Sequence, residues 1–164
     1  INLFYHSLNL QKRIHRPQVW IAAILLLLIL SSCYSRETEK EEFYWDEKKI
    51  VDQRDSYSYW KRNEEKREGG LVLSYSNFTG KETILRFKAG DGNLLLIKID
   101  ISLTRGKFKV CIIQPDMKVI TIDNFVNEKE VQLKTIEGEY RVVIAGIQAY
   151  GRTAIYKGEK GEKK

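Results

Sequence analysis

Residues 94–104 read Leu-Leu-Leu-Ile-Lys-Ile-Asp-Ile-Ser-Leu-Thr, and their alternation decides the fold class. Aliphatic residues occupy every odd position from 95 to 103, whereas polar residues occupy the even positions from 98 to 104. Successive side chains of a β-strand point to opposite faces of a sheet. The stretch therefore predicts a strand with one buried face and one polar face.

The residues that follow predict two turns. Arg105-Gly106 suits a two-residue hairpin loop, because glycine tolerates positive φ. That loop would set apolar residues opposite one another: Leu103 with Phe108, Ile101 with Val110, and Ile99 with Ile112. It would also place Cys111 on the outer face, opposite Asp100. At 115–117 a three-residue loop would pair Ile112 with Ile120 and Val110 with Ile122.

Strand-like runs interrupted by turn residues continue on both sides of this region. They lie at 71–76, 83–89, 107–114, 118–123, 131–136, 139–145 and 151–157. Their spacing predicts an all-β fold, an antiparallel β-sandwich of about seven or eight strands over residues 71–157. Residues 158–164 form a basic tail. The Gly138-Glu139-Tyr140 start of a late strand loosely resembles small secreted β-sandwich domains, a likeness that transfers no function.

The N-terminal region has the pattern of a secretory leader. Residues 19–30 are uncharged and apolar, and they follow a basic stretch. A bilayer span needs about 20 such residues, whereas the apolar part of a signal peptide needs only about 7–15. The alternative is a short anchor that is not cleaved, with Cys33 an incidental thiol.

The end of the leader reads Leu30-Ser31-Ser32-Cys33 and resembles the lipobox of bacterial lipoprotein precursors. The resemblance implies that residues 1–32 are a signal peptide and that Cys33 becomes the acylated N-terminus. Acyl chains contribute about 0.8 kcal/mol per buried methylene, so two or more give stable anchoring. The protein is then expected to be extracytoplasmic, lipid-anchored to the outer face of a bacterial membrane.

Residues 33–70 are highly charged and contain few aliphatic side chains, so we expect a solvated tether. A short helix is compatible with 41–50, since Glu and Lys favour helices. Two aromatic clusters interrupt the charged background. Their members are candidates to lie at the membrane interface, to dock onto the domain or to contact a partner: Tyr44, Trp45, Tyr59 and Trp60.

Composition restricts the available chemistry. The chain has 164 residues and a net charge of +6, which is shared between the leader and the folded part and does not indicate a nucleic-acid site. Both histidines, His6 and His15, precede the expected cleavage site, so the mature protein would lack histidine-based catalytic and zinc sites. No motif indicates a cofactor, a metal or a catalytic residue.

Three functions remain open. The first is a non-catalytic module that binds an envelope polymer or protein through the polar sheet face carrying Lys98, Lys107 and Lys109. The second is an accessory subunit of a membrane complex, contacting it through the aromatic clusters. The third is an envelope hydrolase that uses carboxylates alone, which would require a pair in a cleft with one raised pKa.

Overall fold

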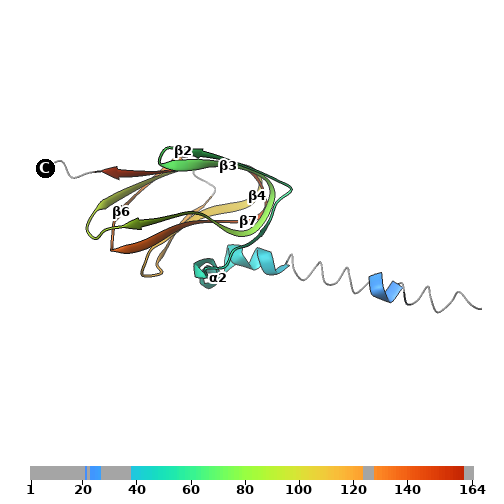
Figure 1. Cartoon of the computed structure of the whole chain (residues 1–164). Coiled ribbons are helices and arrows are strands. Elements are labelled where there is room, and N and C mark those ends of the chain that lie inside the picture. Colours follow the sequence, from blue (N-terminus) through green and yellow to red (C-terminus); the bar gives the residue numbers. More distant parts are fainter. Residues whose placement is uncertain (1–20, 22, 27–37, 124–127, 161–164) are drawn as a thin grey trace, which may run out of the picture. The chain divides into compact units, whose positions relative to one another are not determined.

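Three long antiparallel strands build the fold in the computed structural model, which describes residue 21 and residues 23–26, 38–123 and 128–160. The strands are β3 (Gly70–Ala89), β4 (Leu94–Ile113) and β7 (Gly138–Lys160). β7 lies between the other two and pairs with both along most of its length. Figure 1 shows these strands curving from one layer of the molecule into the other.

Shorter strands complete two layers of a β-sandwich, as the alternation predicts. In the first layer, β2 (Lys61–Arg67) pairs with the early part of β3, and β6 (Glu128–Lys134) pairs with the early part of β4. In the second layer, β1 (Ser56–Ser58) and β5 (Val119–Asp123) pair with the later parts of the same two strands. The prediction of an antiparallel β-sandwich is confirmed.

The hairpin predicted at Arg105-Gly106 is wrong. β4 runs through this position, and its residues 94–103 and 107–113 pair with β7, not with each other. Gly106 does adopt positive φ, +86°, but within an irregularity of register between Leu103 and Lys107. A bulge of this kind bends a strand and increases its twist, which lets β4 pass from one layer to the other.

The turn after β4 follows the prediction. The register joins Val110 to Ile122 and Ile112 to Ile120. Met117 occupies the left-handed site with φ of 65°, although its side chain is unusual there. The Met117 amide donates to the Gln114 carbonyl, and the Gln114 amide donates to the Lys118 carbonyl, both at 2.9–3.0 Å.

A core of aliphatic and aromatic side chains fills the space between the layers. The odd positions 95–101 of β4 are all buried, as their alternation predicts. The Tyr75 ring stacks on that of Phe108 with centroids 4.6 Å apart, at the point where β3 and β4 bend. Both apolar clusters of the described residues belong to the compact unit Glu39–Lys164, which therefore carries its own core.

The sandwich begins before residue 71, inside the region expected to be a tether. β1 and β2 are integral strands of the two layers. Residues 38–45 are helical, and α2 (Glu47–Val51) follows after Asp46, whose side chain caps its first turn. The prediction of a short helix near 41–50 is confirmed in this form. At the other end, β7 extends to Lys160, into the expected basic tail.

Residues 39–55, here called the docked segment, pack on the outside of the second layer. Ile50 is fully buried against Cys111, Ile113 and Val143. Cys111 thus lies on the outer face of its sheet but is covered by α2, and its pairing with Asp100 is wrong, because its strand partners are Thr121 and Val143. Figure 1 shows α2 lying outside the two layers of strands.

Two buried cations hold the C-terminal end of α2 in this position. The Lys81 ammonium donates to the carbonyls of Lys49, Ile50 and Asp52 at 3.1, 3.4 and 2.6 Å. The Arg141 guanidinium donates to the carbonyls of Val51 and Asp52 at 2.6 and 3.1 Å. These bonds satisfy carbonyl groups that a helix leaves without partners at its end. The segment is thus held by charge-assisted bonds as well as by apolar burial.

Most of the leader and its cysteine lie outside the described residues. This applies to Leu30, Ser31, Ser32 and Cys33, so lipid attachment stays a prediction. In the described part of the chain, no helix has the length and apolar character needed to cross a bilayer.

Candidate functional site

The three lysines proposed as one binding face lie on different layers. Lys98 is exposed on the outer face of the first layer, where it forms an ion pair with Glu130 at 3.8 Å. Lys107 and Lys109 belong to the second layer, next to the docked segment. The Lys107 ammonium lies 4.1 Å from the Trp45 ring centroid, and Lys109 is 7% exposed. The prediction that the three lysines share one face is therefore wrong, because β4 changes layers between Lys98 and Lys107.

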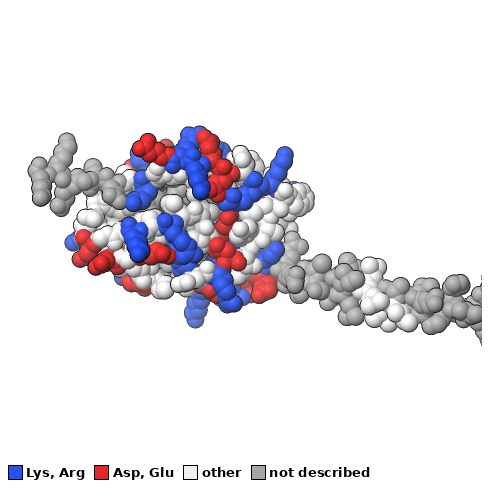
Figure 2. Space-filling view, viewed as in Figure 1, with Lys and Arg blue, Asp and Glu red and all other residues white. Residues whose placement is uncertain are grey.

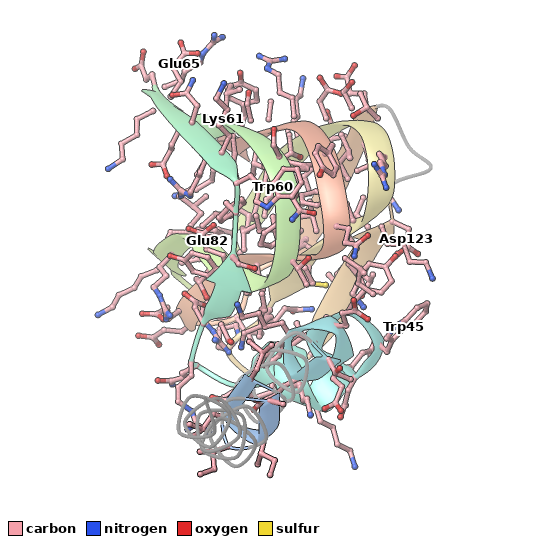
Figure 3. All side chains as sticks on the ribbon, turned by 90° about the vertical axis from the view of Figure 1, so that its right-hand side faces the viewer. Trp45, Trp60, Lys61, Glu65, Glu82 and Asp123 are labelled. Atoms are coloured by element: carbon pink, nitrogen blue, oxygen red, sulfur yellow. The ribbon has the colours of Figure 1, made fainter. Side chains whose placement is uncertain are left out.

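The four aromatic residues also separate into two kinds. The Lys109 ammonium lies 4.9 Å from the Tyr44 ring centroid, and the Tyr59 ring stacks on that of Phe78 with centroids 4.7 Å apart. These two rings serve the fold. Trp45 and Trp60 are 64% and 77% exposed. Figure 3 shows them on separate parts of the molecule, Trp45 beside the helical segment and Trp60 over the strands.

Trp60 is an integral part of the sandwich, and its backbone is well held. Its amide donates to the Ser76 carbonyl at 2.9 Å, at the start of the pairing between β2 and β3. Its neighbour Tyr59 donates its hydroxyl to the carboxylate of Glu82, which is 6% exposed. Arg62 donates to the same carboxylate at 2.9 Å. This buried network fixes the chain on both sides of Trp60, so an exposed indole stands on a rigid support.

Strand register defines the face on which Trp60 stands. Outward residues of the first layer form rows across the strands, since side chains of paired residues share a face. One row contains Asn63, Ser74, Arg152 and Ser102, and the next contains Glu65, Val72, Ala154 and Asp100. We call this surface the Trp60 face; Figure 3 shows Trp60, Lys61 and Glu65 following one another along its edge.

Small side chains in the middle strands make the Trp60 face shallowly hollow. One hollow of about 440 Å³ is lined by Lys61, Asn63, Ser74 and Ser76, among others. A second, of about 300 Å³, lies further along the face and is lined by Lys98, Asp100, Arg152 and Tyr156, among others. Open hollows placed one after another on a sheet suit an extended chain better than an enclosed small molecule.

Aromatic and cationic side chains meet at one end of this face. The Trp60 and Tyr150 rings have centroids 6.2 Å apart and lie nearly perpendicular, at 87°. The Arg105 guanidinium lies 5.7 Å from the Tyr150 centroid, on the strand paired with that residue. Exposed rings of this kind offer an apolar face for stacking and polar edges nearby for hydrogen bonds. The cluster is therefore the strongest candidate binding element of the described chain.

A more apolar groove lies at the edge between the two layers. Its volume is about 460 Å³, and Leu71, Ile84, Leu85 and Phe87 contribute its apolar wall. Arg67 and Arg86 at its rim are already paired with Glu65 and Glu139. Phe87 stacks on Tyr140 with an interplanar angle of 6°, so its ring faces the core. This groove lacks an exposed ring and is a weaker candidate than the Trp60 face.

In the described part of the chain, the carboxyl groups whose pKa is shifted give no indication of a general acid. Hydrogen bonds lower the pKa of Asp52, Glu65 and Asp116, through the Arg54 amide, the Arg67 side chain and the Lys118 side chain respectively. A glycoside hydrolase requires the opposite shift on one of its two carboxyls. Among the described residues, no group of three or more His, Cys, Asp and Glu side chains is placed to hold a metal ion.

Cys111 is equally unsuited to act as a nucleophile. Burial raises the pKa of its thiol to about 11, and its sulfur lies 3.7 Å from the Thr121 hydroxyl. A reactive cysteine instead has a lowered pKa and solvent access. Its position under α2 is that of a core side chain.

Comparisons with known proteins give solved structures of low similarity. No family model matches the chain, and no curated protein matches it significantly. One solved structure, described as "CBM4 structure and function", has a TM-score of 0.35 and 7% identity, over 65% of this chain and 78% of its own.

Two further structures have similarly low scores. An exo-β-1,3-galactanase from Phanerochaete chrysosporium, with galactose, has a TM-score of 0.33 and 12% identity, over 63% of this chain and 29% of its own. A family 11 carbohydrate-binding module of a Clostridium thermocellum cellulase has a TM-score of 0.31 and 10% identity, over 63% of this chain and 83% of its own.

Sequence reasoning selected Trp60 but missed its neighbours. It assigned Trp60 to a tether and therefore did not place it on the sandwich. Tyr150, Arg105 and Arg152 were not singled out as one site. The spacing of Tyr150 and Arg152, two positions apart on a strand, was a usable signal, but only the register of β4 with β7 brings Arg105 beside them.

Proposed function

We propose that this protein is a lipid-anchored, extracytoplasmic lipoprotein whose β-sandwich is a non-catalytic module for binding an envelope polymer. The observation that carries the proposal is the exposed, rigidly supported Trp60 against Tyr150, at one end of a polar and hollow sheet face. The anchor part rests on the resemblance of residues 30–33 to a lipobox.

The geometry favours a polymer over a small ligand. The hollows lie on an open face, and the small side chains between them leave room for a chain to continue from one to the next. A compact ligand is usually bound in a cavity that buries most of its surface. Sugar rings carry both apolar faces and hydroxyl edges, which match an exposed indole together with the polar Asn63, Ser74 and Ser76 that line the hollow of the same face.

Retention by envelope polymers tests the binding part. The full chain in detergent micelles would be passed over immobilised envelope polysaccharide, and Trp60→Ala would be compared with the unchanged protein. We expect Trp60→Ala to bind with at least a tenfold weaker apparent affinity, which corresponds to about 1.4 kcal/mol of binding free energy. Trp45→Ala is the matched control, because it removes a similarly exposed indole outside the Trp60 face.

Two results would contradict the binding proposal: equal retention of Trp60→Ala and the unchanged protein, or an equal loss caused by Trp45→Ala. A loss confined to Trp45→Ala, together with capture of a membrane protein, would support the accessory-subunit function. The anchor is tested separately by the mass of the mature N-terminus. An unmodified Cys33 in membrane-extracted protein would refute acylation without affecting the binding result.

A further inference from the structure

We propose that the Trp60 face binds an acidic glycan, and that Lys61, Arg105 and Arg152 contact its carboxylate or phosphate groups. The inference rests on the proposed function and adds the chemical class of the ligand. It follows from the distribution of paired and unpaired charges around the Trp60–Tyr150 cluster.

The acidic side chains nearest to this cluster already have cationic partners. Arg62 is bonded to Glu64 at 2.6 Å and to Glu82 at 2.9 Å. Arg67 is bonded to Glu65 at 3.1 Å. Three glutamates are thus ion-paired with two arginines on a single edge of the sheet.

The three proposed contact residues have no such partners. Lys61, Arg105 and Arg152 form no ion pair with a described residue. Lys61 directly follows Trp60, while Arg152 is two positions from Tyr150 and so shares its outward face. Arg105 lies opposite Tyr150 on the neighbouring strand. Lys61 and Arg105 therefore flank the aromatic pair, and Arg152 lies between that pair and the hollow of Asp100 and Glu128, which it also lines.

Their chemistry suits an anionic group held next to a stacked ring. A guanidinium has a planar set of donors that matches a carboxylate or phosphate, and Arg105 already lies against an aromatic ring. Lys61 lines the hollow beside Trp60, where its ammonium is available as a flexible donor. A sugar stacked on Trp60 could thus present an acidic substituent to cations from three different strands or their ends.

The opposite end of the Trp60 face carries acidic side chains, so the two ends differ in charge. Asp100, Glu128 and Glu130 lie there, and Lys98 is paired with Glu130. An acidic group is disfavoured among these carboxylates and favoured at the Trp60 end. Figure 2 shows basic and acidic side chains interspersed over the surface that it views, so simple attraction by a uniformly basic surface is not the basis of the inference.

The test compares polymers that differ in charge. The full chain in detergent micelles would be titrated with polygalacturonate, which carries carboxylates, with poly(glycerol phosphate), and with neutral dextran. We expect either polyanion to bind at least tenfold more tightly than dextran, and the preferred polyanion identifies the source of the charge. Arg105→Ala/Arg152→Ala should remove most of that preference, whereas weak binding to dextran should persist because Trp60 remains.

The matched control is Arg67→Ala/Arg86→Ala, which removes the same formal charge from two residues already paired with glutamates. It should keep the preference for polyanions. Equal binding of dextran and both polyanions would overturn this inference while leaving polymer binding intact. An equal loss in both double variants would overturn it too, since net charge alone would then explain the preference. Binding to none of the three polymers would refute the proposed function itself.

Discussion

Lys81 is the side chain whose loss should most directly release the docked segment. It is fully buried, and its ammonium is bonded to three carbonyls at the end of α2. Lys81→Met keeps most of the aliphatic length and removes only the charged donor. The perturbation therefore tests whether charge-assisted capping, in addition to apolar packing, holds the segment on the sheet.

The expected magnitude follows from two opposing effects. A hydrogen bond to a charged group contributes about 1.5–3 kcal/mol. Against this, burial disfavours the charged form, as the lowered pKa of Lys81 indicates. Two of the three carbonyls can also reach water if the segment moves, while Arg141 still holds Val51 and Asp52. We therefore expect docking to weaken by about 2–3 kcal/mol, which raises the undocked population roughly 30- to 150-fold.

Cys111 reports the undocking, because it is buried beneath α2 with Ile50. The assay is the rate at which a thiol reagent labels Cys111 in a Cys33→Ser background, where it is the only cysteine. Lys81→Met should accelerate labelling by the same 30- to 150-fold, since the rate follows the open population when reclosing is fast. Lys88→Met, an exposed lysine of the same strand, should leave the rate unchanged. A Lys81→Met rate within threefold of the parent would refute this account of docking.

Two further predictions concern stability. Folding raises the pKa of the Cys111 thiol from 9.0 to about 11, so between these pH values the native thiol keeps its proton while the unfolded one loses it. The contribution of the thiol to folding stability is therefore full below pH 9 and is lost as the pH rises towards 11. The stability difference between the Cys33→Ser protein and its Cys111→Ala derivative should shrink by about 1.4 kcal/mol from pH 8 to pH 10 in urea unfolding; a constant difference would contradict the shift. Gly106→Ala should destabilise by about 3 kcal/mol or more, because φ is +86° and a Cβ would lie 2.2 Å from the Gln148 carbonyl oxygen. Gly92→Ala, with φ of +76° and open space around it, should lose only about 1 kcal/mol; equal losses would show that the close approach is not important.

The sandwich was predictable because alternation is a local signal. The buried face of β4 follows from residues 95–103, and the register of β4 with β5 follows from the Pro115 turn. The pairing of β4 with β7 was not predictable in the same way. A glycine able to adopt positive φ fits a hairpin loop and a bulge equally well. Only the competing strand β7, some forty residues later, decides between them.

The tether was misjudged for a different reason. Composition measures how much apolar surface a segment offers, and residues 33–70 offer little. It does not show that Ile50 enters a pocket already formed by Ile113 and Val143, or that buried cations on the sandwich bind the backbone carbonyls of α2. Edge strand β2 is likewise wholly polar, because nearly all of its side chains meet solvent. Both elements gain their order from the domain on which they lie.

Docking also limits how far the binding face can be from the membrane, on the proposal that Cys33 carries the lipid. A tether of residues 33–70 could extend to about 130 Å, whereas the six residue steps from Cys33 to Glu39 span at most about 20 Å. The compact unit that begins at Glu39 must then stay next to the bilayer. The proposed polymer should accordingly be one that lies close to the membrane surface. Release of the docked segment, as in Lys81→Met, would lengthen this reach and allow the Trp60 face to contact polymer farther away.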